Sequence, residues 1–300
     1  MKKLLITGAW KYTREQYEIL QKSGYDIIFV QDERGEMPKE AYDAEVVICN
    51  GLFLYHNIEM FGKLKVIQLT SAGYDRVPME YIKEHKIQIH NARGVYSIPM
   101  AEFALCGVLN YYKKSRVFFD NEKKNLWEKN REILEIYGKT VLIIGAGNVG
   151  TECAKRFKAF GTRVRGIDVY PREDINYDSI SALSELEYEL SSADIIVLTL
   201  PLSEETKGLL GENAFNAMKT GALLVNIARG AVVNTGAMIA ALKSGKLGGA
   251  ILDVFEEEPL NANSILWSMD NVIITPHNSF VGENNENRLF DVINHNLKEV

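Results

Sequence analysis

The stretch from Thr140 to Asp168 constrains the fold of this chain more than any other part. An apolar run leads directly into Gly145, Gly147 and Gly150, which have GxGxxG spacing, and a helical pattern and a second apolar run follow. Such glycine spacing often occurs by chance, but here strand, helix and next strand surround it in the order that a dinucleotide-binding βαβ unit needs. The sequence therefore predicts a Rossmann unit that begins near Thr140.

The three glycines have different expected tasks. Gly145 would permit the tight turn, Gly147 would let the backbone approach a pyrophosphate closely, and Gly150 would let the helix pack on the strand. Free N–H groups near Asn148 and Val149, at the start of the helix, would supply partial positive charge for that anion. The alternative is a glycine turn that serves packing alone.

The expected cofactor is NAD, which would act as NADH in the reducing direction. Asp168 lies 18 residues beyond Gly150, at the predicted carboxyl end of the next strand. A carboxylate there can accept two hydrogen bonds from the adenosine ribose and would repel a 2′-phosphate, so the sequence favours NAD over NADP although Arg172 lies nearby. No GxxxxGK[ST] pattern is present, which excludes that phosphate-binding loop.

Short β-branched runs alternate with amphipathic stretches from one end of the chain to the other. This alternation is typical of parallel sheets covered by helices on both faces, so the predicted class is α/β with two doubly wound sheets. The strand candidates are 4–7, 26–30, 46–49, 65–69 and 87–90 in the first series, and 141–144, 163–167, 195–198, 223–226, 250–252 and 272–274 in the second.

Two further segments extend beyond these series of strands. A long helical run begins at Ser97 and leads into the charged stretch 120–135, which is a candidate linker or protruding arm. The segment 284–300 has a helical pattern with Leu289 and Ile293 on one face, and no strand follows it. This last helix could therefore return to the first unit.

Composition excludes several classes of protein. The 300 residues carry a net charge of −6, with 46% hydrophobic and 25% charged residues, which is ordinary for a globular protein and offers little to a nucleic-acid backbone. The longest uncharged stretches, 46–58 and 230–242, are shorter than the about 20 apolar residues that cross a bilayer. Neither a nucleic-acid partner nor a membrane partner is expected.

The three cysteines, Cys49, Cys106 and Cys153, have no CxxC spacing, and each lies beside apolar residues. They predict reduced core thiols in a cytoplasmic protein, and no metal site is expected. The apolar run at 4–6 is too short for the core of a signal peptide, which also favours the cytoplasm.

Three polar residues, Arg229, Glu258 and His277, follow three late strands. Because ligands of parallel sheets bind at the carboxyl ends of strands, these side chains could converge beside the nicotinamide. Arg229 would hold a carboxylate or a polarised carbonyl, His277 would donate a proton to the substrate oxygen, and Glu258 would orient the imidazole and favour its protonated form. Singly, each could instead be structural, as a cap on a sheet edge, part of a solvated acidic run, or a turn residue.

The motifs that carry these residues resemble the NAD-dependent D-isomer-specific 2-hydroxyacid dehydrogenase family. The shared motifs are GAGNVG, DIIVLTLPLSEETKGLLGE, NIARG, LDVFEEEP and TPH, and the resemblance spans nearly the whole chain. It implies a Rossmann NAD-binding domain at 95–281, inserted into a flavodoxin-like substrate domain at 1–94 and 282–300. It also implies a homodimer built partly on the helix and arm at about 97–136.

The same resemblance assigns roles position by position. Arg229, Glu258 and His277 match the substrate arginine, the histidine-orienting glutamate and the acid/base residue. Predicted cofactor-binding residues are Gly145, Gly147, Asn148, Val149, Gly150, Asp168, Leu200, Pro201, Thr206, Ile227, Ala228 and Asp253, and predicted substrate-binding residues are Ser71, Ala72, Gly73, Tyr96 and Phe280.

In the substrate group, the N–H groups of Ala72 and Gly73, in SAGYD, would meet the substrate carboxylate. Tyr96 and Phe280 resemble aromatic pocket positions of the D-lactate dehydrogenase branch. The glycine segment could instead be an ordinary surface turn, and the two aromatics could be core residues.

The implied activity is interconversion of a small 2-keto acid and the D-2-hydroxy acid, with hydride from NADH and a proton from His277. One alternative is an NAD-responsive, corepressor-like binding module, because such relatives keep the three polar residues. Within the enzyme class the alternatives are a phosphoglycerate or a glyoxylate/hydroxypyruvate reductase. A formate-type dehydrogenase would leave the histidine–glutamate pair unexplained.

Overall fold

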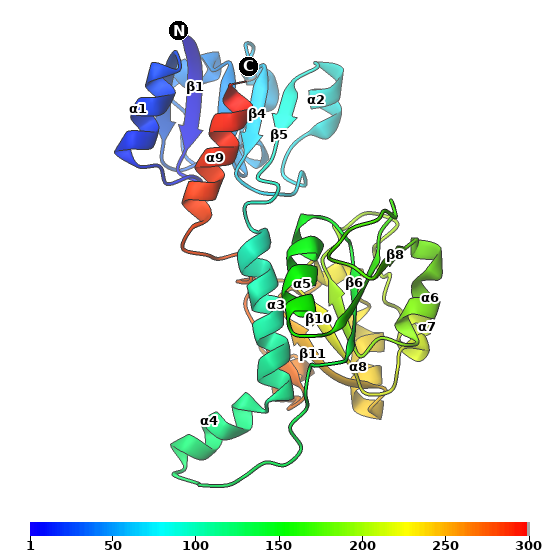
Figure 1. Cartoon of the computed structure of the whole chain (residues 1–300). Coiled ribbons are helices and arrows are strands. Elements are labelled where there is room, and N and C mark those ends of the chain that lie inside the picture. Colours follow the sequence, from blue (N-terminus) through cyan, green and yellow to red (C-terminus); the bar gives the residue numbers. More distant parts are fainter. Residues whose placement is uncertain (299–300) are drawn as a thin grey trace. The chain divides into compact units, whose positions relative to one another are not determined.

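The computed structural model describes residues 1–298; residues 299 and 300, which end the predicted terminal helix and the predicted substrate domain, lie outside the described residues. The chain divides into two compact units. Unit 1 consists of Met1–Tyr96 together with the segment from Gly282 onward, and unit 2 consists of Ser97–Val281. In Figure 1 the blue and cyan first part and the red last helix form unit 1, and the middle of the chain forms unit 2.

Unit 1 is built on five parallel strands in the order β2-β1-β3-β4-β5, which is the flavodoxin-like order. All five strands were predicted, because each is a short run rich in β-branched or other apolar residues. They are β1 (Lys2–Thr7), β2 (Tyr25–Val30), β3 (Val46–Cys49), β4 (Val66–Leu69) and β5 (Gln88–His90).

The last helix, α9 (Asn285–Leu297), belongs to unit 1, as the sequence pattern suggested. Leu289, Ile293 and Leu297 are buried in the same cluster as residues of β1, β3 and β4. The hydroxyl of Tyr25 donates to the carbonyl of Leu297 over 3.1 Å. The other helices of unit 1 are α1 (Arg14–Lys22), which begins with a capping box at Thr13, and α2 (Met79–Glu84).

Unit 2 contains seven parallel strands in the order β12-β11-β10-β9-β6-β7-β8. The strand order reverses at β6, as in a Rossmann sheet, so the predicted fold class of an inserted Rossmann domain is confirmed. The strands are β6 (Thr140–Ile144), β7 (Arg163–Ile167), β8 (Ser179–Ser181), β9 (Ile195–Leu198), β10 (Ala222–Asn226), β11 (Leu247–Leu252) and β12 (Val272–Ile274).

The sequence predicted six strands in this series and missed β8. This strand has only three residues, Ser-Ile-Ser, and pairs with β7 alone at the edge of the sheet. Its burial pattern is exposed at the first residue and intermediate at the other two, so it lacks the apolar run that revealed the other strands.

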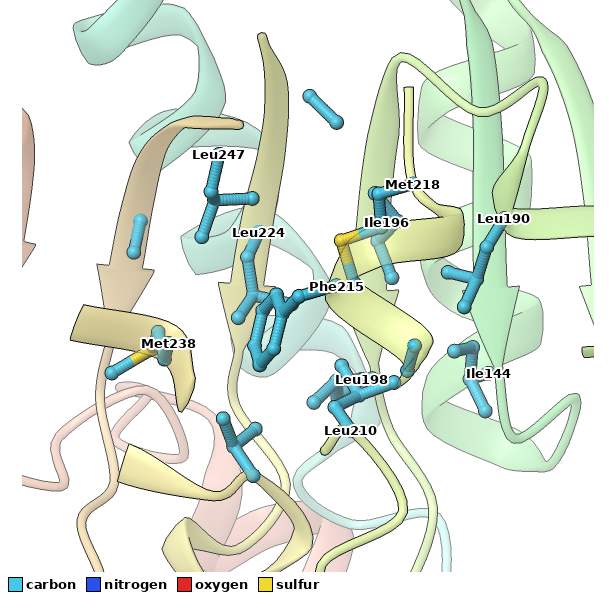
Figure 2. Packing of buried hydrophobic residues seen from close by; sticks show 14 of the residues in the cluster. Ile144, Leu190, Ile196, Leu198, Leu210, Phe215, Met218, Leu224, Met238 and Leu247 are labelled. Atoms are coloured by element: carbon cyan, nitrogen blue, oxygen red, sulfur yellow. The ribbon is translucent and has the colours of Figure 1, made fainter. Parts of the chain in front are cut away.

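Helices cover both faces of the unit 2 sheet. Figure 2 shows part of the cluster on one face, where Phe215 lies against Leu224 of β10 and Met218 lies against Ile196 of β9. A second buried cluster includes Ala104, from the long helix after Ser97. The helices are α3 (Ser97–Tyr112), α4 (Ser115–Lys123), α5 (Asn148–Ala159), α6 (Leu186–Leu190), α7 (Glu212–Ala217) and α8 (Thr235–Ser244).

The segment predicted as a linker or arm consists of α4 and the irregular stretch that follows it (Figure 1). Several large apolar side chains of this segment face solvent, and Trp127 is 97% exposed. One cysteine prediction was wrong: Cys106 is exposed on α3, whereas Cys49 and Cys153 are buried. Among the described residues no helix has the length and apolar character needed to span a membrane.

Candidate active site

The glycine turn after β6 is shaped by two close contacts. Gly145 has φ of +100°, and a Cβ there would lie 2.6 Å from the backbone nitrogen of Leu200. A Cβ on Gly150 would lie 2.1 Å from the carbonyl oxygen of Gly145. The fold alone therefore requires glycine at both positions, whether or not a ligand is bound. Among the described residues, apart from its neighbours in the chain, no heavy atom lies within 4 Å of the position that a Cβ on Gly147 would take, so this position faces open space.

The open side of the turn is the start of α5, whose N-cap residue is Gly147. Asn148 is exposed and Val149 is half-buried at its first positions. The first N–H groups of a helix have no intrahelical acceptor, and the helix dipole adds partial positive charge there. The turn thus combines room for close approach with donors for an anion, which fits the pyrophosphate of a dinucleotide.

Asp168 follows β7 and lies against this turn. Its Oδ2 accepts from the N–H of Ala146 at 2.8 Å, and its Oδ1 accepts from the N–H of Tyr170 at 3.0 Å. A carboxylate has about four acceptor sites, so both oxygens retain capacity for ribose hydroxyls. The guanidinium of Arg172 donates to the carbonyl of Ala146 and lies 3.9 Å from Asp174.

The loop after β9 contributes mainly to the shape of the cofactor site. Thr199 donates its hydroxyl to the carbonyl of Gly145 at 2.6 Å, and Leu200 is buried beside that glycine. The hydroxyl of Thr206 donates to the carbonyl of Pro201 and accepts from the N–H of Ser203. The Thr206 side chain therefore fixes the loop from within, and the role of Thr199 was not predicted.

The loop after β10 presents Arg229. Ile227 and Ala228 are buried, and Arg229 is half-buried, with its guanidinium donating to the carbonyl of Ala228 at 2.8 Å. Asn226 fastens the loop by accepting from the N–H of Ala228 and donating to the carbonyl of Arg229. The sequence analysis did not predict this role of Asn226. The available signal was a polar residue at the end of the buried run LLVN.

Gly230 brings this loop against the one that follows β11. A Cβ at that position would lie 1.8 Å from the carbonyl carbon of Phe255, so the two backbones touch. Glu258 lies three residues further on and accepts from the N–H of Phe255 through Oε1 at 3.0 Å. Arg229 and Glu258 are therefore carried by two loops in direct contact.

The structure brings Glu258 and His277 together. Oε2 of Glu258 lies 2.8 Å from Nδ1 of His277, and the two side chains are 36% and 40% exposed. The ring of Phe280 meets the imidazole edge to face, with centroids 5.9 Å apart. An aromatic ring thus lies beside the imidazole, and the other ring nitrogen, Nε2, is not engaged by the glutamate.

Asp253, predicted as a cofactor contact, holds the loop that carries the histidine. It is fully buried and accepts from the hydroxyl of Thr275 and the N–H of Asn278 at 2.8 Å, and from the N–H of Ser279 at 2.9 Å. Its carbonyl accepts from the N–H of His277. These bonds hold His277 at φ of +50°, a conformation that non-glycine residues seldom adopt.

The predicted substrate residues divide between the two units. Ser71, Ala72 and Gly73 follow β4 in unit 1, where Ser71 donates its hydroxyl to the carbonyl of Gly73 and Asn91 donates its amide to that of Ala72. The hydroxyl of Tyr96 donates to the carbonyl of Thr70, and burial raises the pKa of Tyr96. Phe280, Arg229, Glu258 and His277 lie in unit 2.

The chain matches the family model described as D-isomer specific 2-hydroxyacid dehydrogenase, NAD binding domain, over residues 105–279. D-3-phosphoglycerate dehydrogenase of Methanocaldococcus jannaschii is 32% identical over 304 residues, which cover 100% of this chain and 57% of the relative. Glyoxylate reductase of Korarchaeum cryptofilum is 32% identical over 240 residues, covering 78% of this chain and 72% of the relative. The chain spans about half the length of the D-3-phosphoglycerate dehydrogenase relatives: its match covers 57% of the Methanocaldococcus jannaschii enzyme and 52% of the D-3-phosphoglycerate dehydrogenase of Archaeoglobus fulgidus.

Two solved structures are similar to this chain over nearly its whole length. A D-isomer specific 2-hydroxyacid dehydrogenase family protein of Aeromonas salmonicida superposes with a TM-score of 0.82 at 28% identity, covering 99% of this chain and 95% of the other. D-lactate dehydrogenase of Aquifex aeolicus, complexed with NAD and lactic acid, superposes with a TM-score of 0.78 at 27% identity, covering 98% and 94%.

Proposed function

This chain belongs to the D-isomer-specific 2-hydroxyacid dehydrogenase family, and on that basis we propose that it interconverts a small 2-keto acid and the corresponding D-2-hydroxy acid with NAD(H). The observation that carries the proposal is the 2.8 Å contact between Glu258 and His277, at the carboxyl edge of a dinucleotide-type sheet. An imidazole held by a carboxylate is suited to exchange a proton with a substrate oxygen near neutral pH.

The residues of unit 2 have separate tasks in this reaction. When bound, the dinucleotide supplies or accepts the hydride at the substrate carbon. The glycine turn and the start of α5 would bind its pyrophosphate, and Asp168 its adenosine ribose. Arg229 would bind the substrate carboxylate or keto oxygen, because a guanidinium offers paired donors to such groups.

His277 would move the proton. Because Nδ1 faces Glu258, Nε2 is the atom that would give its proton to the keto oxygen during reduction and take it back during oxidation. Glu258, through its 2.8 Å contact with Nδ1, would fix the orientation of the ring. Phe280, edge to face with the imidazole, would add an apolar contact beside it.

We propose NAD as the preferred form of the cofactor. Asp168 lies against the turn and would meet a 2′-phosphate with like charge, while the guanidinium of Arg172 is engaged by the carbonyl of Ala146. The remaining predicted substrate contacts, the N–H groups of Ala72 and Gly73 and the ring of Tyr96, stay predictions of the same proposal.

A steady-state assay tests the function. Purified protein is offered pyruvate, phenylpyruvate, 2-ketoisocaproate, hydroxypyruvate and glyoxylate with NADH and with NADPH, and 3-phospho-D-glycerate with NAD in the oxidative direction. We expect NADH oxidation with at least one keto acid and formation of the D-hydroxy acid. Turnover of glyoxylate and hydroxypyruvate alone would identify the protein as a glyoxylate/hydroxypyruvate reductase. Turnover of the phosphorylated acid alone would favour the phosphoglycerate alternative. Absence of turnover across the whole panel would support a corepressor-like binding module instead.

We further propose that the chain forms a homodimer through α3 and the arm. Phe119 on α4 is 59% exposed and Trp127 in the arm is 97% exposed. Large apolar side chains exposed on one segment are typical of a surface that binds another protein. Sedimentation should give twice the chain mass, and Trp127→Ser should weaken the dimer. A monomer at micromolar concentration would contradict this proposal without affecting the proposed reaction.

A further inference from the structure

A carboxylate of the chain itself is bound at the carboxyl ends of β1 and β3 in unit 1. In the order β2-β1-β3-β4-β5 the crossovers change direction between β1 and β3, and open α/β sheets bind ligands beyond the carboxyl ends of the strands at such a point. β1 ends at Thr7 and β3 ends at Cys49. The side chain found between these two ends is that of Glu33, from the segment that follows β2.

Glu33 is bound by three donors from the two strand ends. Its Oε1 accepts from the hydroxyl of Thr7 and from the N–H of Asn50, and its Oε2 accepts from the N–H of Gly51, each at 2.7 Å. Two successive N–H groups aimed at one anion form the kind of concavity that binds phosphates and carboxylates in other proteins. Distances of this length are typical of hydrogen bonds to a charged group.

The backbone is shaped to admit this carboxylate. A Cβ on Gly8 would lie 2.1 Å from the carbonyl oxygen of Gln31, so only glycine at this position lets the segment after β2 approach the end of β1. On the other side, Nε2 of His56 lies 3.0 Å from the carbonyl oxygen of Glu33. Glu33 is thus fastened both to the strand ends and to the far end of the loop that follows β3.

The aliphatic stem of Arg76 lies next to the same point. The Cβ position of Gly51 is 3.5 Å from Oε2 of Glu33 and 3.9 Å from Cδ of Arg76, which belongs to the loop after β4. β3 and β4 are paired neighbours, and the N–H of Thr70 donates to the carbonyl of Cys49 at 2.8 Å. The Glu33 carboxylate lies at the end of β3, and the turn that begins at Ser71 follows the neighbouring strand β4.

We propose that the three donors at these strand ends form a carboxylate-binding site occupied in cis by Glu33, and that Glu33 is a positioning residue for the loop 50–56. Without the Glu33 carboxylate, the N–H groups of Asn50 and Gly51 would lose their acceptor, and unpaired donors in a part-buried site are costly. A small external carboxylate, with formate as the probe, would then enter the vacated space and restore these bonds.

The test compares thermal unfolding of full-length wild type, Glu33→Ala, Glu33→Gln and the control Glu36→Ala, which removes an exposed carboxylate from the same segment. Glu33→Ala should lower the apparent melting temperature by about 4–8 °C, as expected for the loss of several charge-assisted bonds in a chain of this size. Sodium formate should recover much of that loss compared with sodium chloride at equal ionic strength. Wild type and Glu36→Ala should show no such preference for formate.

Glu33→Gln keeps the side-chain volume and should melt between wild type and Glu33→Ala without responding to formate, because the amide still fills the site. If Glu33→Ala does not fold, the same proposal predicts faster hydrogen exchange at the amides of Asn50 and Gly51 in Glu33→Gln. An unchanged melting temperature in Glu33→Ala, formate acting no better than chloride, or unchanged exchange at these amides would each overturn the proposal.

A kinetic arm rests on the proposed function. Because the loop lies beside the turn at Ser71–Gly73, Glu33→Ala should raise the KM for the keto acid about tenfold, a typical effect of misplacing a binding loop, with the KM for NADH unchanged. Formate should partly reverse the change in KM. If wild type shows no turnover, the proposed reaction fails while the unfolding data still decide the role of Glu33. An unchanged KM in an active Glu33→Ala enzyme would refute the positioning role.

Discussion

Nδ1 of His277 and Oε2 of Glu258 lie 2.8 Å apart, although the two residues follow different strands and are 19 residues apart in the chain. The glutamate is held by the N–H of Phe255, and the histidine loop is held by the buried carboxylate of Asp253. The contact is therefore supported from both sides and does not depend on two flexible surface side chains meeting. A pair held in this way is suited to proton transfer.

The first prediction concerns this pair. His277→Ala should lower kcat for keto-acid reduction by about 100-fold or more, because the group that would donate a proton to the keto oxygen is removed. Glu258→Gln should cause a smaller loss, about 10-fold, because the proton donor remains but an amide replaces the carboxylate that contacts Nδ1 and orients the ring. The KM for NADH should change little in both variants. His85→Ala, an exposed histidine in unit 1, serves as the control, and a His277→Ala enzyme with the wild-type rate would exclude the proposed role.

The second prediction separates two glycines of the turn. Gly147→Ala should fold and melt like wild type, because nothing lies within 4 Å of its Cβ position, yet it should lose most of the stabilisation that NADH gives. Gly150→Ala should destabilise the protein by about 1–3 kcal/mol even without NADH, because its Cβ would overlap the carbonyl oxygen of Gly145. Thermal unfolding with and without NADH measures both effects. Full NADH stabilisation of Gly147→Ala would show that the pyrophosphate does not approach this position.

The third prediction concerns the choice of cofactor. Asp168→Asn should lower kcat/KM for NADH about 10-fold or more and should raise the ratio of NADPH to NADH activity, because the charge that repels a 2′-phosphate is removed. The ratio is the decisive measurement, since general loss of structure would lower both activities together. Glu173→Gln, an exposed carboxylate five residues later, is the matched control. A wild-type preference for NADPH would mean that Asp168 does not discriminate as proposed.

Much of the fold could be predicted because buried parallel strands leave a simple signal. Strands such as Ile195–Leu198 are fully buried on both faces and read as unbroken apolar runs, whereas β8 is a polar edge strand with no such run. Cys106 was misplaced for a related reason: α3 is apolar on much of its surface, so its apolar neighbours did not reveal which face the thiol occupies.

The site could be predicted only in part, because strand ends locate functional side chains but not the groups that fasten them. His277 and Glu258 were predicted as site residues from their places after two strands, and the contact between them is seen only in three dimensions. The bonds from Asp253 to the histidine loop, and from Asn226 to the arginine loop, depend on loop backbones that no local pattern specifies. The three-donor site around Glu33 was missed because its parts come from three separate segments.

The fourth prediction concerns the cysteines. Burial raises the pKa of Cys153 to about 12, and burial also raises the pKa of Cys49 well above its usual value, so both thiols remain protonated and shielded at pH 8. Because the thiolate is the reactive form, a thiol reagent should modify Cys106, which is exposed on the single chain, before the other two, and should modify Cys49 and Cys153 only after unfolding. Peptide mass spectrometry during labelling measures the order. Early modification of Cys49 or Cys153 would contradict the buried positions found here.

The fifth prediction concerns acid stability. Asp194 joins the starts of β6 and β9, because its Oδ2 accepts from the N–H of Thr140 at 2.9 Å and its Oδ1 accepts from Nζ of Lys219 at 2.6 Å. Burial acts to raise the pKa of Asp194, but the ion pair with Lys219 and the bond from Thr140 outweigh it and hold the pKa below its usual value.

A carboxyl whose pKa is lower in the folded than in the unfolded protein stabilises the fold fully above the unfolded value, about 3.9, and progressively less as pH falls toward the folded value. Asp194→Asn should therefore lower the free energy of unfolding by about 1–2 kcal/mol at neutral pH, since half-exposed Lys219 adds little to the bond from Thr140. Urea unfolding followed by circular dichroism should give a constant difference from wild type between pH 5 and pH 8 that shrinks below about pH 4. Asp270→Asn, at an exposed aspartate, should show no such difference. A gap that widens on acidification would mean that Asp194 is stabilised by being neutral, so that the bond from Thr140 and the ion pair with Lys219 do not hold its pKa below the usual value.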